Sequence, residues 1–464
     1  MNTKSVFFAA ALFATAALAA DAVEENASSF RYGGDIRLRQ ELWDDIPLPT
    51  EDPIVTRNGF NNTYRLRSRV FGAYDFTDWL TANVRLTHMF YDTVAGPESF
   101  KWPDELSIDN ANIVLHDLTG EGSKLILGRQ DILLGSGRLV FEGTALDAAR
   151  TTFFDGILFH QPKEDGNESI DIFAVYNKDE DPFAIGNVHR QLRGYSPSVK
   201  GRDEAGAGWF YNMHPSEDVL GSIYFIWKHE TGAWAADGSH LRNEHYYTLG
   251  FYLKGRLSDR LSGELELATQ NDQTFAHRSM SHFWSHFFSY HHTHTPLHPG
   301  LAYAGLDWDA IEREGKTKSP FTIGLDCLYL SADDPDSSRN EAFSPIFSRY
   351  PFLSELMIYC FDTEGAGNWS NILHPRAKAA VRHEGHEVLL AAGPVFAVEP
   401  NGAGGGSDRG WLYTAQYTFP LLAGFKDGRG KTAGCLLLEL LDPGDYYLSE
   451  HTAYFFRWQI TVAF

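Results

Sequence analysis

Hydrophobic and polar side chains alternate along much of the chain. In the segment 30–42, Ile36 and Leu38 share one parity, while Arg37 and Arg39 occupy the other. The same alternation recurs in the segments 64–76, 80–90, 247–256 and 261–267. A period of two is typical of a β-strand, because successive side chains point to opposite faces. Short polar connections join several of these segments, as in β-hairpins. The sequence therefore predicts an antiparallel all-β fold.

The last segment, YFFRWQITVAF, raises the question of what surrounds such strands. One of its faces is wholly apolar and ends at Phe464, whereas the other carries Arg457 and Gln459. A soluble β-sandwich could use this strand, and so could a membrane barrel with its apolar face against lipid. Long polar stretches such as DDIPLPTEDPIVTRNGFNN separate the hairpins, and alternation of short turns with long loops is typical of outer-membrane barrels. We therefore expect a transmembrane antiparallel β-barrel of 18 strands, or of 16, with the final strand closing against the first.

The N-terminal residues read as a secretory signal peptide. Lys4 precedes the apolar run 6–18, and Ala17-Leu18-Ala19 has the small-residue pattern of a cleavage site. The predicted domains are thus a signal peptide at 1–19 and a single barrel domain at 20–464. The expected location is the bacterial outer membrane, with outer-membrane lipid as one partner. Phe464, an aromatic at the end of the last strand, resembles the assembly signal of outer-membrane proteins.

Composition narrows the possible functions. Aromatic residues reach 14% although only 43% of residues are hydrophobic, as expected of aromatic girdles around a polar lumen. A large sugar-binding β-protein would have a similar composition, so a soluble secreted carbohydrate-binding protein stays open. The net charge of -22 argues against nucleic acid as a partner. Three cysteines do not make a disulfide framework.

Arginine is concentrated on the polar parity of the early strands. Strands that are adjacent in sequence usually lie side by side, so these guanidinium groups would line one wall of the lumen. Basic lumens favour anions, and guanidinium forks suit carboxylates. Salt bridges that merely fill the interior are the alternative, and parity alone does not choose between the two. The predicted anion-binding positions are Arg37, Arg39, Arg65, Arg67, Arg69, Arg85 and Arg457, and the opposing lumen acids are Asp35, Glu41, Glu264 and Glu266.

The stretch LILGRQDILLGSGRLVFEGTALDAARTTFFDGILF resembles the alginate-export family of outer-membrane barrels. The matching parts are Gly128-Arg129-Gln130, the run 135–139 and Phe154-Asp155-Gly156. The resemblance implies an 18-stranded barrel that exports an acidic polysaccharide of mannuronate and guluronate through an arginine-lined pore. It also implies that Arg129 is a pore arginine and that periplasmic export proteins are partners. A general or anion-selective uptake porin is the alternative function.

The remaining patterns do not favour catalysis or a cofactor. The chain has no G-x-S-x-G, H-E-x-x-H or P-loop motif, so we expect a channel and not an enzyme. Seven histidines fall between His277 and His298, but no carboxylate or cysteine there completes a recognisable metal-ligand set. We therefore predict no metal and no cofactor, and interpret this segment as a polar aromatic loop.

Overall fold

The computed structural model confirms the predicted barrel. It describes residues 30–49, 56–57, 59–96, 105–141, 154–163, 166–178, 183–187, 202–232, 243–272, 299–311, 319–334, 336, 341–344, 346–348, 354–360, 370–422 and 431–464. The predicted signal peptide and the histidine-rich segment 277–298 lie outside these residues. Among the described residues, no helix is long and apolar enough to cross a membrane.

Eighteen of the described strands form one closed antiparallel ring, so the higher of the two predicted strand numbers is correct. They are β1 (Phe30–Asp44), β4 (Asn61–Thr77), β5 (Leu80–Ala95), β6 (Glu105–His116), β7 (Lys124–Gln130), β10 (Phe154–Pro162), β11 (Glu168–Asn177), β13 (Glu204–Ser216), β14 (Val219–Glu230), β15 (Glu244–Arg256), β16 (Leu261–Asp272), β17 (Pro299–Asp309), β18 (Phe321–Leu330), β20 (Ile372–His383), β21 (His386–Phe396), β22 (Asp408–Leu422), β23 (Lys431–Asp442) and β24 (Ala453–Ala463).

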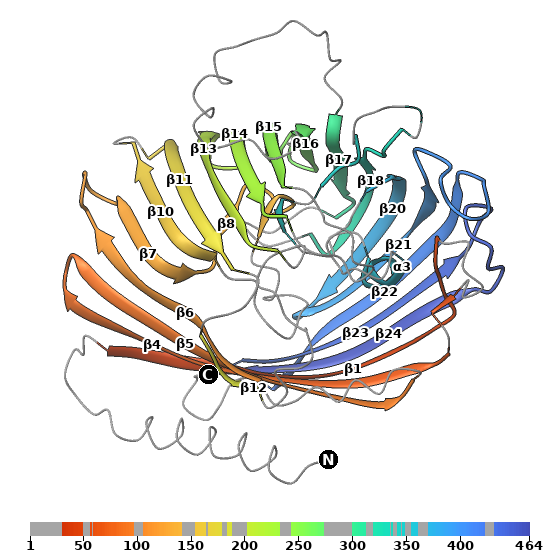
Figure 1. The fold of residues 1–464 in the computed structure, drawn as a ribbon, viewed down its shortest axis with the longest axis horizontal. Helices are drawn as coiled ribbons and strands as arrows, with labels where there is room; N and C mark the ends of the chain where they lie inside the picture. Colours follow the sequence, from red (N-terminus) through yellow and green to blue (C-terminus); the bar gives the residue numbers. More distant parts are fainter. Residues whose placement is uncertain are drawn as a thin grey trace, which may run out of the picture.

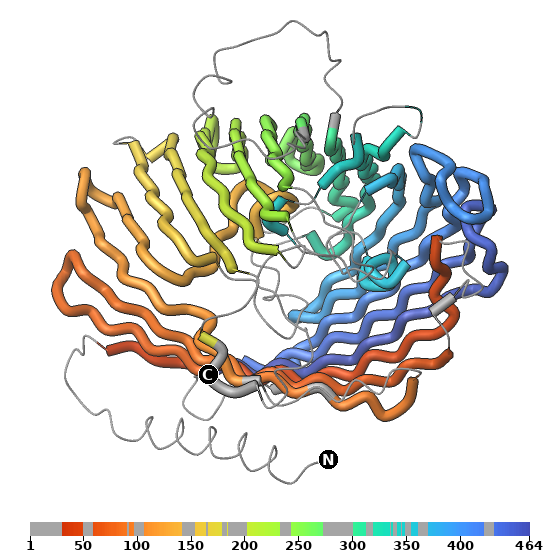
Figure 2. The backbone as a smooth tube through the Cα atoms, in the orientation of Figure 1, coloured from red at the N-terminus to blue at the C-terminus, as the bar shows by residue number. Residues whose placement is uncertain are grey.

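The ring closes where the first strand pairs with the last. β1 and β24 are antiparallel, with Leu38 opposite Ile460, and Figure 2 shows the red and blue ends of the chain side by side. Phe464 continues this pairing, because its N–H donates to Gly34 O at 3.0 Å and its carbonyl accepts from Gly34 N at 2.9 Å. The predicted closure of the final strand against the first is confirmed. No strand edge is left open at this seam, as a membrane barrel requires.

The alternation of side chains separates an outer apolar face from an inner polar one. Leu38 is 39% exposed and Val84 47% exposed on the outer face, whereas Arg37 and Arg39 on the inner face are buried. Short connections, such as those between β4 and β5 and between β20 and β21, lie at one rim. The strand ends from which the long connections start lie at the other rim, which is the arrangement of periplasmic turns and outer loops in barrels of this class.

Part of the chain folds into the lumen (Figure 1). We call this part the lumen plug; its described residues are 131–141, 341–344, 346–348 and 354–360. It contains a small sheet of β8 (Leu133–Leu134), β9 (Val140–Phe141) and β19 (Phe347–Ser348), together with the helix α3 (Glu355–Cys360). Two further short pieces, β2 (Ile46–Pro47) and β3 (Thr56–Arg57), pair with each other. A last one, β12 (Ala184–Asn187), pairs with the start of β6.

Candidate functional site: an arginine block on the inner wall

Five arginines form a compact group where β1 meets β4. We call Arg37, Arg39, Arg65, Arg67 and Arg69 the arginine block. The strand register places Arg37 directly opposite Arg67, and Arg39 directly opposite Arg65. Like charges directly opposite each other across two strands are destabilising. A wall selected only for stability would avoid this arrangement, so the block requires either counter-ions or a functional reason.

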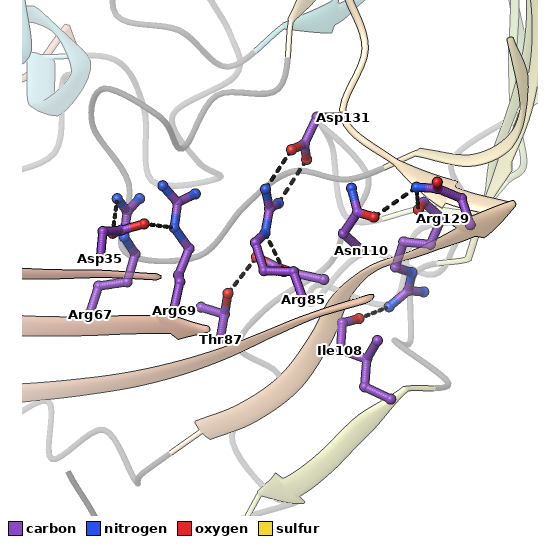
Figure 3. Close-up of polar contacts among 11 residues, drawn as sticks. Asp35, Arg67, Arg69, Arg85, Thr87, Ile108, Asn110, Arg129 and Asp131 are labelled. Carbon is purple, nitrogen blue, oxygen red and sulfur yellow. Dashed lines mark hydrogen bonds and ion pairs between the residues drawn. The ribbon is translucent and has the colours of Figure 1, made fainter. Parts of the chain in front are cut away.

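Two carboxylates neutralise part of the positive charge of the arginine block. Asp35 accepts from Arg67 at 3.0 Å and from Arg69 at 2.6 Å. Glu41 pairs with Arg39 at 3.1 Å and with Arg65 at 2.9 Å. Figure 3 shows Arg67 and Arg69 reaching the same carboxylate of Asp35. Arg31 and Asp75 share this parity and pair with each other at 2.6 Å, so the described residues of β1 and β4 set six inward guanidinium groups against three inward carboxylates.

Two members of the block keep contact with the lumen. The side chains of Arg65 and Arg69 are 20% and 15% exposed, whereas the side chain of Arg39 is fully buried. Residues two apart on a strand lie about 6.6 Å apart along it, so Arg65, Arg67 and Arg69 form a short ladder along β4. A carboxylate moving along the wall could therefore pass from one guanidinium fork to the next.

Two other predicted lumen arginines have different surroundings. Arg85 on β5 donates to Asp109 at 2.7 Å and, through both terminal nitrogens, to Asp131 at 2.7 and 2.9 Å. Arg457 on β24 donates to Glu355 of α3 at 2.5 Å. Both side chains face inward as predicted. Their contacts, however, bind the lumen plug to the wall, because Asp131 and Glu355 both belong to the plug.

The expectation that Arg129 is a pore arginine is wrong. Arg129 pairs with Ala111, which shares the outer parity of β6 with the exposed Ile113. Its guanidinium donates to both carboxylate oxygens of Asp155 at 2.7 Å. It also donates to the carbonyl of Ile108 at 2.9 Å (Figure 3). Arg129 is buried even so, and the ring of Phe183 lies 4.6 Å from its guanidinium carbon.

The lumen plug packs against the apolar part of the inner wall. Phe347 of β19 meets Phe154 and Phe173 edge-to-face, with ring centroids 6.0 and 6.1 Å apart. The helix α3 begins where Ser354 accepts the N–H of Met357 at 3.1 Å. This is ordinary N-capping of a helix that is only six residues long. The plug also reaches the arginine block, because Arg65 donates to the hydroxyl of Tyr359 in α3 at 3.5 Å.

Comparisons with known proteins identify the fold. No protein-family model and no curated protein sequence matches the chain. Among solved structures, the outer membrane protein OprD from Pseudomonas aeruginosa superposes with a TM-score of 0.52 and 9% identity, covering 94% of each chain. The fold is that of bacterial outer-membrane β-barrels. Pseudomonas aeruginosa OccK5 (OpdH) gives 0.53 and 10% over 94% of this chain and 97% of that one, and Acinetobacter baumannii OccAB3 gives 0.52 and 12% over 93% and 99%.

Similarity at identities this low shows the architecture of the chain and does not show its substrate. None of these three proteins is named as an alginate exporter, so the comparisons support the predicted barrel and its membrane location without supporting alginate export. The outer face agrees with the fold, because exposed leucine, isoleucine, valine and aromatic side chains cover it. Such a face suits hydrocarbon and not water.

The predicted acids Glu264 and Glu266 face the lumen but do not oppose the arginine block. They bind Arg138 of the lumen plug, at 2.8 and 3.0 Å. The guanidinium carbon of Arg138 also lies 3.7 Å from the centre of the Tyr303 ring. The sequence could have suggested Arg138 as a partner of inward acids, since a basic side chain after a Gly-Ser-Gly turn can reach two inward glutamates. Its place in the lumen could not.

A second contact of the plug was missed by the sequence analysis. Lys228 on β14 is fully buried and binds Glu204 at 2.8 Å and Glu230 at 2.7 Å. Its ammonium group also donates to the carbonyl of Ile346 at 2.5 Å and lies 4.9 Å from the ring of Phe347. The sequence signal is the one lysine of β14, which shares the inward parity with Ile226 and Glu230. Lys228 and Arg138 thus tether two segments of the plug to the barrel.

Proposed function

We propose that the chain is an outer-membrane channel through which small anionic solutes, carboxylates in particular, diffuse along the arginine block. The observation that carries the proposal is the pairing of Arg37 with Arg67 and of Arg39 with Arg65 across the strands. Like charges directly opposite each other are unfavourable unless counter-charges accompany them, and a solute carboxylate would be such a counter-charge. A guanidinium fork binds a carboxylate through two parallel hydrogen bonds.

The lumen plug favours small solutes over a polymer. Its ion pairs and hydrogen bonds through Arg85, Arg138, Lys228 and Arg457 reach several different strands, so a wide opening would require many of these contacts to break at once. The export of an acidic polysaccharide is therefore the weaker interpretation of the same basic wall. In a passive channel of this kind the concentration gradient of the solute sets the direction of transport. An anionic nutrient outside the cell would therefore diffuse inward.

Ion selectivity tests the proposal. The purified barrel is inserted into a planar bilayer, and the reversal potential is measured under a tenfold salt gradient, where a perfectly selective pore gives about 59 mV. We expect the wild type to prefer anions and the double variant Arg65→Glu, Arg69→Glu to prefer cations. Lys254→Glu is the comparison variant, because it reverses a lumen charge outside the block, beside Glu264 at 3.1 Å, and should move the reversal potential much less than the double variant. A wild-type barrel that prefers cations would overturn the proposal.

A further inference from the structure

The outer wall carries a long apolar groove over β15–β22. Its volume is about 820 Å³. One row of outward side chains runs straight across the strands, since Leu265 is opposite Ala304, Ala304 is opposite Cys327 and Cys327 is opposite Pro375. Small residues form the floor, and larger exposed side chains, Leu306 at 50% and Leu325 at 64%, stand beside it.

The groove rises obliquely through the membrane. It starts at the short turns, where Val219 and Leu257 line it, and ends at Trp411, the fourth residue of β22 from the long-loop rim. Strands are spaced about 4.8 Å apart, so the six steps from β15 to β22 span about 29 Å. With a strand tilt of about 40°, this distance rises about 19 Å along the membrane normal, slightly more than one leaflet of an approximately 30 Å hydrocarbon core.

We propose that this groove binds an acyl chain of a phospholipid from the periplasmic leaflet. The exposed surface of the lining is almost entirely apolar, because the charged residues that border it, Glu264, Asp326 and Arg376, turn their side chains to ion pairs on the inner face. A second barrel presents a convex wall, which would rest on Leu306 and Leu325 without reaching the floor, whereas a flexible hydrocarbon chain can enter. The periplasmic leaflet follows from the end of the groove that lies at the short turns, because such turns face the periplasm in barrels of this class.

The position of the small residues supports a specific site and not general contact with lipid. Ala377 is opposite Ala392 where β20 and β21 meet, and both line the groove. A second groove of about 540 Å³ over β18–β23 shares these two alanines. One enlarged side chain at either position would therefore divide the depression. An acyl chain bound at Ala377 and Ala392 would lie over β20 and β21, with wall strands on both sides that restrict its motion.

The test is photo-crosslinking of the full-length barrel in vesicles that contain phosphatidylethanolamine with a diazirine in its acyl chain. We expect adducts in the peptides from β18, β20 and β21 at several times the yield found on the outer face of β4–β6. The variant Ala377→Leu, Ala392→Leu should lower the yield to that background. Ala82→Leu, Ala174→Leu is the control, since both alanines are outward-facing and lie outside the groove.

Three results would overturn the proposal. The first is uniform labelling of the outer wall by the wild type, which needs no variant and is independent of folding. The second is preferential labelling by a diazirine-bearing lipid A, which would place the ligand in the other leaflet. The third is barrel-to-barrel crosslinking through Cys327, which would make the groove an interface between copies. If the double alanine variant does not assemble, Cys327→Phe fills the same floor and tests the same expectation.

Discussion

Replacing Lys228 by methionine should release part of the lumen plug. The ammonium group lies 2.8 Å from Glu204, 2.7 Å from Glu230 and 2.5 Å from the carbonyl of Ile346. The side chains of Lys228, Glu204 and Glu230 are each only 1% exposed. Removing one partner of a buried ion pair costs about 3–5 kcal/mol, because the other charge stays in a medium that solvates it poorly. Every 1.4 kcal/mol is a factor of ten. The population with a detached segment should rise about a hundred- to four-thousand-fold.

Single-channel recording in a planar bilayer measures this change. The wild type should give steady current, whereas Lys228→Met should give frequent transitions between conductance levels as residues 346–348 detach and return. Folding of each preparation is checked by its migration on a gel with and without heating. Lys254→Met is the matched control, since it removes an exposed lysine from the neighbouring strand. If a folded Lys228→Met barrel conducts as steadily as the wild type, Lys228 does not hold the plug.

Three further predictions concern other contacts. Arg85→Met should lower the stability of the barrel by about 3–5 kcal/mol because Asp109 is completely buried, and adding Asp109→Asn should restore most of it in a denaturant titration. Arg138→Gln should shift the reversal potential toward cations, because Glu266 loses its cationic partner and Glu264 keeps only Lys254; an unchanged potential would contradict this. Gly34→Val should reduce the folded fraction on a heat-modifiability gel, since a Cβ there would lie 2.8 Å from the ring of Phe464; normal assembly would contradict it.

Alternation of side chains was sufficient to predict most of the barrel. β1, β4 and β5 keep one parity over many residues, so their inner and outer faces can be assigned from the sequence alone. Cys327 and Cys435 likewise fall on opposite faces, as the phasing of their strands predicts, because Cys327 is opposite Ala304 and Cys435 is opposite the inward Gln459. In these regions local geometry decides the direction of each side chain.

The failures lie where the chain departs from regular pairing. The register of β5 and β6 shifts between Arg85 and Leu86, and Gly128 has a φ of 117°, so parity cannot be counted through this region. Arg129 was assigned from the resemblance and faces the wrong way for a pore. The lumen plug was also unpredictable, since a stretch such as 132–141 is as apolar as a strand and only its contacts with distant β-strands show that it lies inside.

The opposed arginines have a thermodynamic consequence. A solute carboxylate that binds beside Arg65 or Arg69, the two members that keep contact with the lumen, would add a counter-charge to the closely opposed guanidinium groups. Binding to the folded state alone raises stability by about 2.7 kcal/mol when the ligand is at a hundred times its dissociation constant. Preferred anions should therefore raise the melting temperature of the detergent-solubilised barrel. A thermal scan across small carboxylates would then rank the natural cargo without any measurement of transport.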